Sequence, residues 1–363
     1  MSSLDIETIR RAEFWATLDK KAADHRIPVT AMIELTYGCN LNCVHCYNPT
    51  HQAKGELAIE EIYRILDELA EAGCLSVSFT GGELFTRRDV VEVFHYAQAK
   101  GFRITILTNA TLITAEVADA LEALPLERIE ISIYGATAET YERVTGVPGS
   151  HARFLRGVEL LRQRQLPLLV KMPVLTLNVH EVAQARALVE SWGIRFVFCT
   201  DLIPRVNGSP VPLQYRLPPD AAVKTRRELA GYPVWRAEGG GEKGQACQAE
   251  KGLFTCKCGK NGLAVTPYGE MNLCVSFPIP KYDLRTGNVS SGWKTLVDLV
   301  DSATPSEAYE CPTCELERYC RQGPVNAWLE TGDFSPCLPY FKELAVLEKQ
   351  EYGTASGSVL KKE

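Results

Sequence analysis

Between residues 31 and 200 the sequence alternates six short apolar runs with longer amphipathic stretches, and this alternation limits the possible folds most strongly. The apolar runs, predicted to be strands, are residues 31–37, 75–80, 103–108, 128–134, 167–174 and 194–199. The helix-patterned stretches between them are residues 58–72, 88–100, 114–124, 138–144 with 152–165, and 179–192. Such alternation is typical of a parallel sheet with right-handed crossovers. We therefore predict an α/β fold, a partial (β/α)6 barrel of the TIM type, with its functional face where strands end and helices begin.

The pattern changes after residue 200. Residues 201–246 are rich in proline and glycine and are predicted to be a linker or insertion. Residues 247–340 contain eight of the 13 cysteines among turn residues, which indicates a small module held together by metal more than by an apolar core. Residues 1–30 are predicted to form a helical arm, and residues 341–363 a helix and tail.

Composition excludes several classes of protein. The chain has 363 residues, 45% of them hydrophobic, with 39 basic and 45 acidic residues and a net charge of -6. This balance excludes a disordered chain and gives no electrostatic reason to expect nucleic acid or a membrane surface as partner. No apolar run approaches the roughly 18 residues needed to cross a bilayer. We predict a cytoplasmic protein, in which close-spaced cysteines are metal ligands before they are disulfides.

Three cysteines follow the first predicted strand directly. Cys39, Cys43 and Cys46 have the spacing Cys-x3-Cys-x2-Cys, with no fourth cysteine close by. Three thiolates on a four-iron cluster leave one iron without a protein ligand, and an open metal position is where chemistry happens. The alternatives from spacing alone are an incomplete zinc site or unpaired thiols.

This motif, in this position, resembles that of the radical S-adenosylmethionine (SAM) superfamily. The resemblance implies a [4Fe-4S] cluster on the three cysteines, with SAM bound to the fourth iron. It also implies that the turn Gly81-Gly82-Glu83 holds the SAM amino group, and that Ser132 and Arg143 contact the ribose and the methionine carboxylate. Tyr47, Asn109 and a packing role for His45 complete the expected cofactor pocket.

The later cysteines resemble those of a SPASM domain, an extension of many radical SAM maturases. Its first half is matched by Cys258, Gly269 and Cys274, and its second by Cys311, Cys314, Cys320 and Cys337. The resemblance implies one or two auxiliary iron-sulfur clusters. Pro324 stands where the family has a further cysteine, so either Cys247 or Cys256 is a substitute ligand, or the first auxiliary cluster has an open iron, is a two-iron form, or is absent. Zinc is the alternative for both groups, and Cys74 and Cys199 are expected in the core.

The resemblance implies an enzyme that cleaves SAM reductively and abstracts a hydrogen atom from its substrate. The expected substrate is a ribosomally synthesised peptide or a protein side chain; thioether formation, crosslinking, epimerisation, backbone cleavage and sulfatase-type oxidation all remain open. The alternatives are tetrapyrrole or other small-cofactor biosynthesis, and a non-enzymatic iron-sulfur carrier or sensor. The expected redox partner is a reductase such as flavodoxin or ferredoxin. Because only about thirty residues precede the first strand, a leader peptide would need this short arm or a separate leader-peptide-binding protein.

Overall fold

The computed structural model describes residues 3–229, 253–254 and 256–352 and confirms the α/β fold. Within these residues one nine-stranded sheet has the order β6-β5-β4-β3-β2-β1-β7-β8-β9. The neighbouring strands from β6 to β7 are all parallel, and β8 and β9 are antiparallel additions. The strands are β1 Thr30–Thr36, β2 Ser76–Gly81, β3 Arg103–Thr108, β4 Arg128–Ser132, β5 Leu168–Pro173, β6 Arg195–Cys199, β7 Gly262–Val265, β8 Glu270–Asn272 and β9 Tyr282–Asp283.

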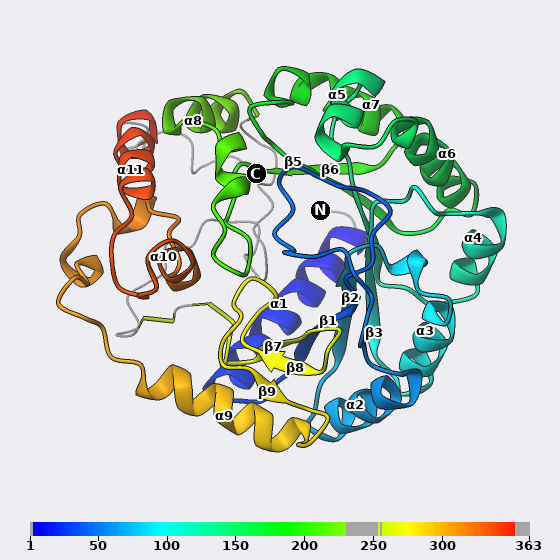
Figure 1. Cartoon of the computed structure of the whole chain (residues 1–363), viewed down its shortest axis with the longest axis horizontal. Coiled ribbons are helices and arrows are strands. Elements are labelled where there is room, and N and C mark those ends of the chain that lie inside the picture. Colours follow the sequence, from blue (N-terminus) through cyan, green and yellow to red (C-terminus); the bar gives the residue numbers. More distant parts are fainter. Residues whose placement is uncertain (1–2, 230–252, 255, 353–363) are drawn as a thin grey trace.

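Six helices form an arc outside the parallel strands (Figure 1). They are α2 Ile59–Glu71, α3 Val90–Ala99, α4 Ala115–Glu122, α5 Ala138–Thr145, α6 Ser150–Gln163 and α7 Val182–Ser191. Their apolar sides face the sheet, as an amphipathic pattern requires. The six predicted strands and the helices between them are thus confirmed, with boundaries that differ by only a few residues.

The two sides of each barrel strand carry different side chains. On β1, Ile33 and Leu35 belong to the buried apolar core that the helices cover. Alternate residues point to the opposite side of a strand, so Glu34 faces the concave side, as do Glu130 on β4 and Lys171 on β5. Lys171 Nζ lies 2.5 Å from Glu130 Oε2. The concave side of the sheet is therefore polar and charged.

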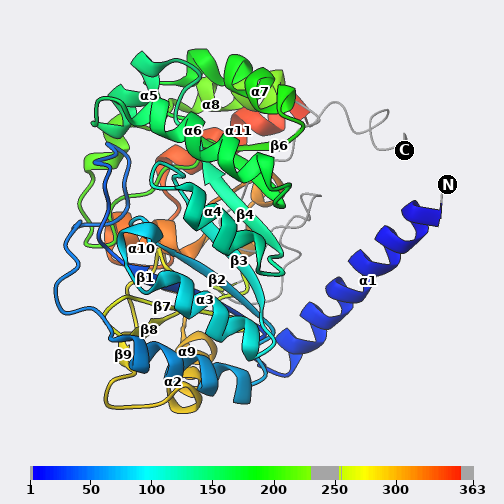
Figure 2. The same cartoon turned by 90° about the vertical axis from the view of Figure 1, so that its right-hand side faces the viewer.

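The amino-terminal helix α1, Ser3–Asp24, projects from one side of the body (Figure 2). Its second half contacts the rest of the chain: the guanidinium of Arg103 lies 4.0 Å from the ring centre of Trp15, and Lys257 Nζ lies 2.7 Å from an Asp19 carboxylate oxygen. No helix within the described ranges has the length and apolarity to traverse a bilayer.

The region after residue 200 differs from the expected linker. Helix α8, Pro219–Glu228, begins with a proline, whose fixed φ suits the first helical position and whose missing N–H has no helical partner to lose. The other elements are α9 Val289–Ser302, α10 Pro324–Thr331, α11 Pro339–Tyr352 and the 3-10 turns η1 Leu84–Thr86, η2 Val179–Glu181, η3 Val211–Tyr215, η4 Cys311–Thr313 and η5 Glu317–Tyr319.

The cysteine-rich region also continues the barrel sheet. Strand β7 pairs with β1 in parallel register, Thr30 with Gly262 through Ile33 with Val265. Sequence patterning did not indicate this, because four-residue β7 is too short to show a period. The first strand of the barrel is therefore a central strand of the whole sheet.

Candidate cofactor site

Cys39, Cys43 and Cys46, here called the first thiol group, lie on the loop that leaves the carboxyl end of β1. All three are free and partly buried. Burial raises the pKa of the Cys39 thiol to about 11 and raises the pKa of Cys43 still further, and the charges of the neighbouring thiols add to both shifts. A metal cation beside these thiols would favour the thiolate forms. Three gathered thiols fit a cluster that takes three protein ligands.

The loop of the first thiol group is held by two neighbouring segments. Asn42 N and Val44 N donate to the carbonyl oxygens of Thr145 and Val144 at the end of α5, over 2.9 and 3.0 Å. On the other side, Asn40 Nδ2 donates to Thr111 Oγ1 over 2.8 Å. These bonds fix the loop between the ends of β3 and α5.

The turn Gly81-Gly82-Glu83 packs directly on the start of this loop. A Cβ on Gly81 would lie 2.2 Å from the Thr36 carbonyl oxygen, and one on Gly82 would lie 2.3 Å from that of Gly38. Gly81 also has φ +145°, which disfavours a side chain. The glycines are therefore needed for close contact with the cysteine loop itself, a reason that the sequence did not reveal.

The carboxylate of Glu83 joins the ends of β2 and β3. Its Oε1 accepts a hydrogen bond from Thr108 Oγ1 and its Oε2 accepts one from Asn109 N, each over 2.7 Å. Burial raises the pKa of the completely buried Glu83 to about 7, against these hydrogen bonds, which lower it. Asn109 in turn donates through Nδ2 to Asn40 over 3.2 Å. The hydrogen bonds of Glu83 and Asn109 thus link the glycine turn, the end of β3 and the cysteine loop.

Glu34 was not singled out from the sequence, although a charged residue inside an apolar strand is a usable signal. Its two carboxylate oxygens accept hydrogen bonds from Tyr47 over 2.7 Å and from Tyr37 over 3.1 Å. Burial raises the pKa of Glu34 to about 7, and the tyrosine hydrogen bonds oppose this shift. The predicted residue Tyr47 therefore ties the end of the cysteine motif to β1.

Ser132 and Arg143 lie on two elements that border the loop. Ser132 is the last residue of β4, two residues before Tyr134. Arg143 is exposed near the end of α5, where its Nη2 donates to the Leu177 carbonyl oxygen over 2.8 Å. Tyr134, another residue missed in the sequence, packs its ring on that of His45 within the cysteine motif.

His45 fills the position before Cys46 and packs on an aromatic ring. Its ring centre lies 5.3 Å from that of Tyr134. Burial lowers the pKa of His45 to about 4, so that the imidazole is neutral at physiological pH. A neutral ring in this position suits packing.

The structure also gathers Cys256, Cys258 and Cys274, here called the second thiol group. The Cys258 thiol is hydrogen-bonded to the thiols of both Cys256 and Cys274. The hydrogen bond from Cys258 lowers the pKa of Cys256 to about 7, although burial opposes this shift. Cys247 lies outside the described residues.

Four further cysteines form the third thiol group: Cys311, Cys314, Cys320 and Cys337. They lie on or beside the 3-10 turns η4 and η5 and just before α11. Burial raises the pKa of Cys320 to about 11, and the charges of the other three thiols add to this shift. Pro324, which replaces an expected cysteine, is the first residue of α10.

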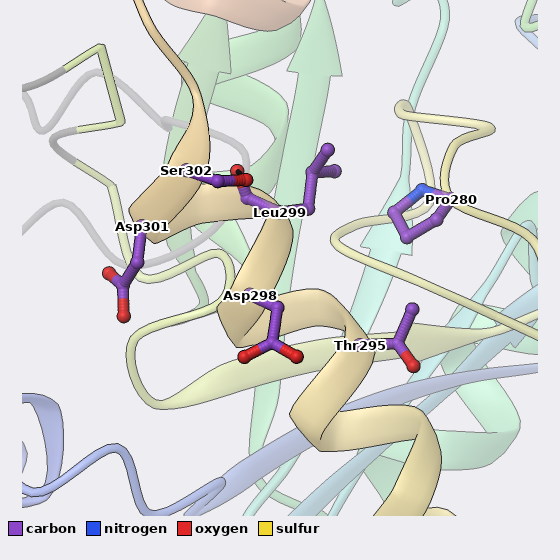
Figure 3. Close-up of a pocket in the computed structure, with 6 residues that line it drawn as sticks. All are labelled: Pro280, Thr295, Asp298, Leu299, Asp301 and Ser302. Carbon is purple, nitrogen blue, oxygen red and sulfur yellow. Dashed lines mark hydrogen bonds between the residues drawn. The ribbon is translucent and has the colours of Figure 1, made fainter.

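A surface cavity of about 620 Å³ lies along α9, remote in sequence from the first thiol group (Figure 3). It is lined by Pro280, Thr295, Asp298, Leu299, Asp301 and Ser302. Asp301 is paired with Arg26. The lining contains no thiol or imidazole and no predicted site residue, so this cavity is not a candidate for the reaction.

Comparisons with known proteins identify the family of this chain. The Radical SAM superfamily matches residues 33–189. Mycofactocin maturase MftC of Mycobacterium ulcerans is 30% identical over 324 residues, which cover 84% of this chain and 85% of that protein. AdoMet-dependent heme synthase of Methanosarcina barkeri is 28% identical over 328 residues, which cover 85% of this chain and 94% of that protein.

A solved structure shares the fold. Streptococcus suis SuiB bound to its precursor peptide SuiA superposes with a TM-score of 0.69 over 91% of this chain and 79% of that one, at 15% identity. The chain belongs to the radical SAM superfamily. It is therefore an enzyme, not a simple electron carrier or sensor, and its family implies SAM and a [4Fe-4S] cluster as cofactors.

Proposed function

We propose that this enzyme cleaves SAM reductively and uses the resulting radical to abstract a hydrogen atom from a peptide or a protein side chain. The observation that carries the proposal is the first thiol group at the carboxyl end of β1, with the turn Gly81-Gly82-Glu83 packed against its loop. The carboxyl ends of barrel strands are where such folds place their chemistry.

Cys39, Cys43 and Cys46 would hold the [4Fe-4S] cluster, which when bound supplies the electron for SAM cleavage. The chain's own residues orient the ligands and exclude water. Gly81, Gly82 and Glu83 set the backbone that receives the SAM amino group, while Ser132 and Arg143 are assigned to the ribose and the methionine carboxylate. Tyr47 and Asn109 brace the pocket through Glu34 and Glu83.

The second and third thiol groups would hold auxiliary iron-sulfur clusters. The second group offers three thiols, Cys256, Cys258 and Cys274, and Cys247 is the proposed fourth ligand. The third group offers four thiols, enough for a complete ligand set. Their role would be to accept or supply an electron during substrate oxidation, with a flavodoxin or ferredoxin as external reductant.

A peptide substrate is supported by the maturase relative and by the SuiB structure, which contains a precursor peptide. A leader-peptide-binding protein is the proposed helper. A second candidate, tetrapyrrole biosynthesis, is favoured by the heme synthase relative, which is matched over 94% of its length. Tight binding of a porphyrin to the reconstituted enzyme, with no modification of any peptide encoded beside its gene, would favour the second candidate.

The first test is SAM cleavage after anaerobic reconstitution. We expect 5′-deoxyadenosine from the wild-type enzyme under reducing conditions, and none from a variant with Cys39, Cys43 and Cys46 changed to alanine, because the cluster would have no ligands. Cys74→Ala is the matched control, since Cys74 is a buried thiol whose sulfur donates to the Ser76 carbonyl oxygen within the fold. Undiminished 5′-deoxyadenosine from the triple variant would contradict the assignment.

A further inference from the structure

Arg205 lies beside the first thiol group, and its guanidinium has no hydrogen-bond partner within the described residues. It follows β6, in the segment that was predicted to be a linker, and is partly buried. Its Nε is buried and has no hydrogen-bond partner, and no carboxylate in the described part of the chain forms an ion pair with it. A buried guanidinium nitrogen without a hydrogen-bond partner is costly, so it indicates a ligand.

The backbone holds Arg205 in place. Arg205 N donates to the Ser209 carbonyl oxygen and Gly208 N donates to that of Arg205, over 2.9 and 2.8 Å, which closes a tight turn. The next residue, Val206, donates its N–H to the Tyr47 carbonyl oxygen over 2.9 Å. The turn is thereby fixed to the end of the cysteine motif.

Asn48, next to Tyr47, provides a second and independent observation. Its side chain is buried, with 3% of the residue exposed, and neither its amide nitrogen nor its amide oxygen has a hydrogen-bond partner. A side-chain amide whose donor and acceptor both lack a hydrogen-bond partner is complementary to a peptide group, which offers one acceptor and one donor.

The electrostatic surroundings favour an anion here. Burial lowers the pKa of His51, and the positive charge of Arg205 lowers it further, so the two side chains lie close together. A carboxylate would satisfy the guanidinium of Arg205 through two parallel hydrogen bonds.

We propose that Arg205 and Asn48 form a substrate subsite, in which Arg205 binds a carboxylate of the peptide and Asn48 binds the adjoining peptide group. This inference rests on the proposed function, since it places the peptide's carboxylate beside the SAM cluster. The proposed function assigns Arg143 to the carboxylate of SAM, so Arg205 is available for a carboxylate of the peptide.

The test uses the full-length reconstituted enzyme and two small probes, N-acetyl-alanyl-alanine and its carboxyl-terminal amide, with binding measured by ligand-observed NMR. We expect the wild type to bind the acid about tenfold or more tightly than the amide, which is the usual effect of a hydrogen bond to a charged group. Arg205→Gln should bind both probes equally. Arg205→Lys, which keeps the charge but loses the planar fork, should retain a reduced preference.

Two further measurements separate the roles. Asn48→Ala should weaken binding of the acid and the amide by the same factor, about fivefold, because both probes contain the peptide group. N-acetyl-aspartate amide tests whether a side-chain carboxylate is accepted in place of a terminal one. The control is Arg186→Gln on α7, where Arg186 is paired with Glu190, and it should behave like the wild type.

Equal binding of acid and amide by the wild type, or an unchanged preference in Arg205→Gln, would overturn the subsite. A tenfold loss of SAM affinity in Arg205→Gln would also overturn it, by assigning Arg205 to SAM. Because probe binding needs no SAM cleavage, failure of the wild type to produce 5′-deoxyadenosine would contradict the proposed function while leaving the subsite standing.

Discussion

At the scale of single residues, the site depends on contacts that leave no room for a side chain. Gly82 is the clearest position, because a Cβ there would meet the carbonyl oxygens of Gly38 and Tyr37 at 2.3 and 2.7 Å. Backbone atoms cannot move aside as the end of a flexible side chain can. A side chain at residue 82 would therefore displace the backbone of the turn, of the cysteine loop, or of both.

We predict that Gly82→Ala lowers the free energy of unfolding by about 1–3 kcal/mol, the usual range for overpacking, and reduces SAM affinity. Denaturant unfolding and equilibrium binding of SAM would measure these effects. Gly323→Ala is the control, because its Cβ would meet nothing closer than 3.6 Å. Wild-type stability and SAM affinity in Gly82→Ala would contradict the steric role.

The sequence predicted site residues where a motif has fixed spacing. The first thiol group could be found because its cysteines are neighbours on one loop. Asn48 and Arg205 could not, since their proximity depends on a hydrogen bond between residues 47 and 206, far apart in the chain. The same reason explains the true role of the glycines, which face a loop more than forty residues earlier in the sequence.

At the scale of elements, β4 and β5 are linked by a buried ion pair on the concave side of the sheet. Burial alone would raise the pKa of Glu130, but Lys171 and Arg128 lower it overall. Only 8% of each side chain of the Glu130–Lys171 pair is exposed. Breaking a pair so well buried from one side is costly, because Glu130 would keep only the half-exposed Arg128 as its ion partner.

We predict that Lys171→Met lowers the free energy of unfolding by about 3 kcal/mol, and that adding Glu130→Leu restores most of the loss. Because the pKa of folded Glu130 lies below its usual 4.5, the unfolded chain takes up the proton first as pH falls. Wild-type stability should therefore fall below about pH 4.5 more steeply than that of the double variant. Denaturant titrations across this pH range would test both statements, and parallel pH profiles would contradict the second.

The elements themselves were largely predictable within residues 31–200, where each helix and strand is long enough to show its period. The prediction was less complete after residue 200. Helix α8 begins at Pro219 in a proline-rich stretch that was interpreted as a linker, and β7 spans only Gly262–Val265. The conformation of such short elements depends on the segments packed against them, and their own sequences show little hydrophobic periodicity.

At the scale of the whole molecule, the count of metal ions tests the assignment of the three thiol groups together. We expect about eight to twelve irons per chain after anaerobic reconstitution, for two or three four-iron clusters. Changing Cys311 and Cys314 to alanine should remove about four of them while leaving SAM cleavage measurable. Zinc as the dominant metal would contradict the assignment of the second and third thiol groups.

The pairing of β1 with β7 has one more consequence. The first thiol group leaves the carboxyl end of β1, whereas Cys258 precedes Gly262, which is level with Thr30 at the amino end of the same strand. The six steps between the seven residues of β1, at about 3.3 Å each, separate the two ends of the strand by about 20 Å along its axis. A hydrogen-bonded strand keeps this length, whereas a flexible linker would not. Electron transfer between the first and second thiol groups would therefore cross a constant distance.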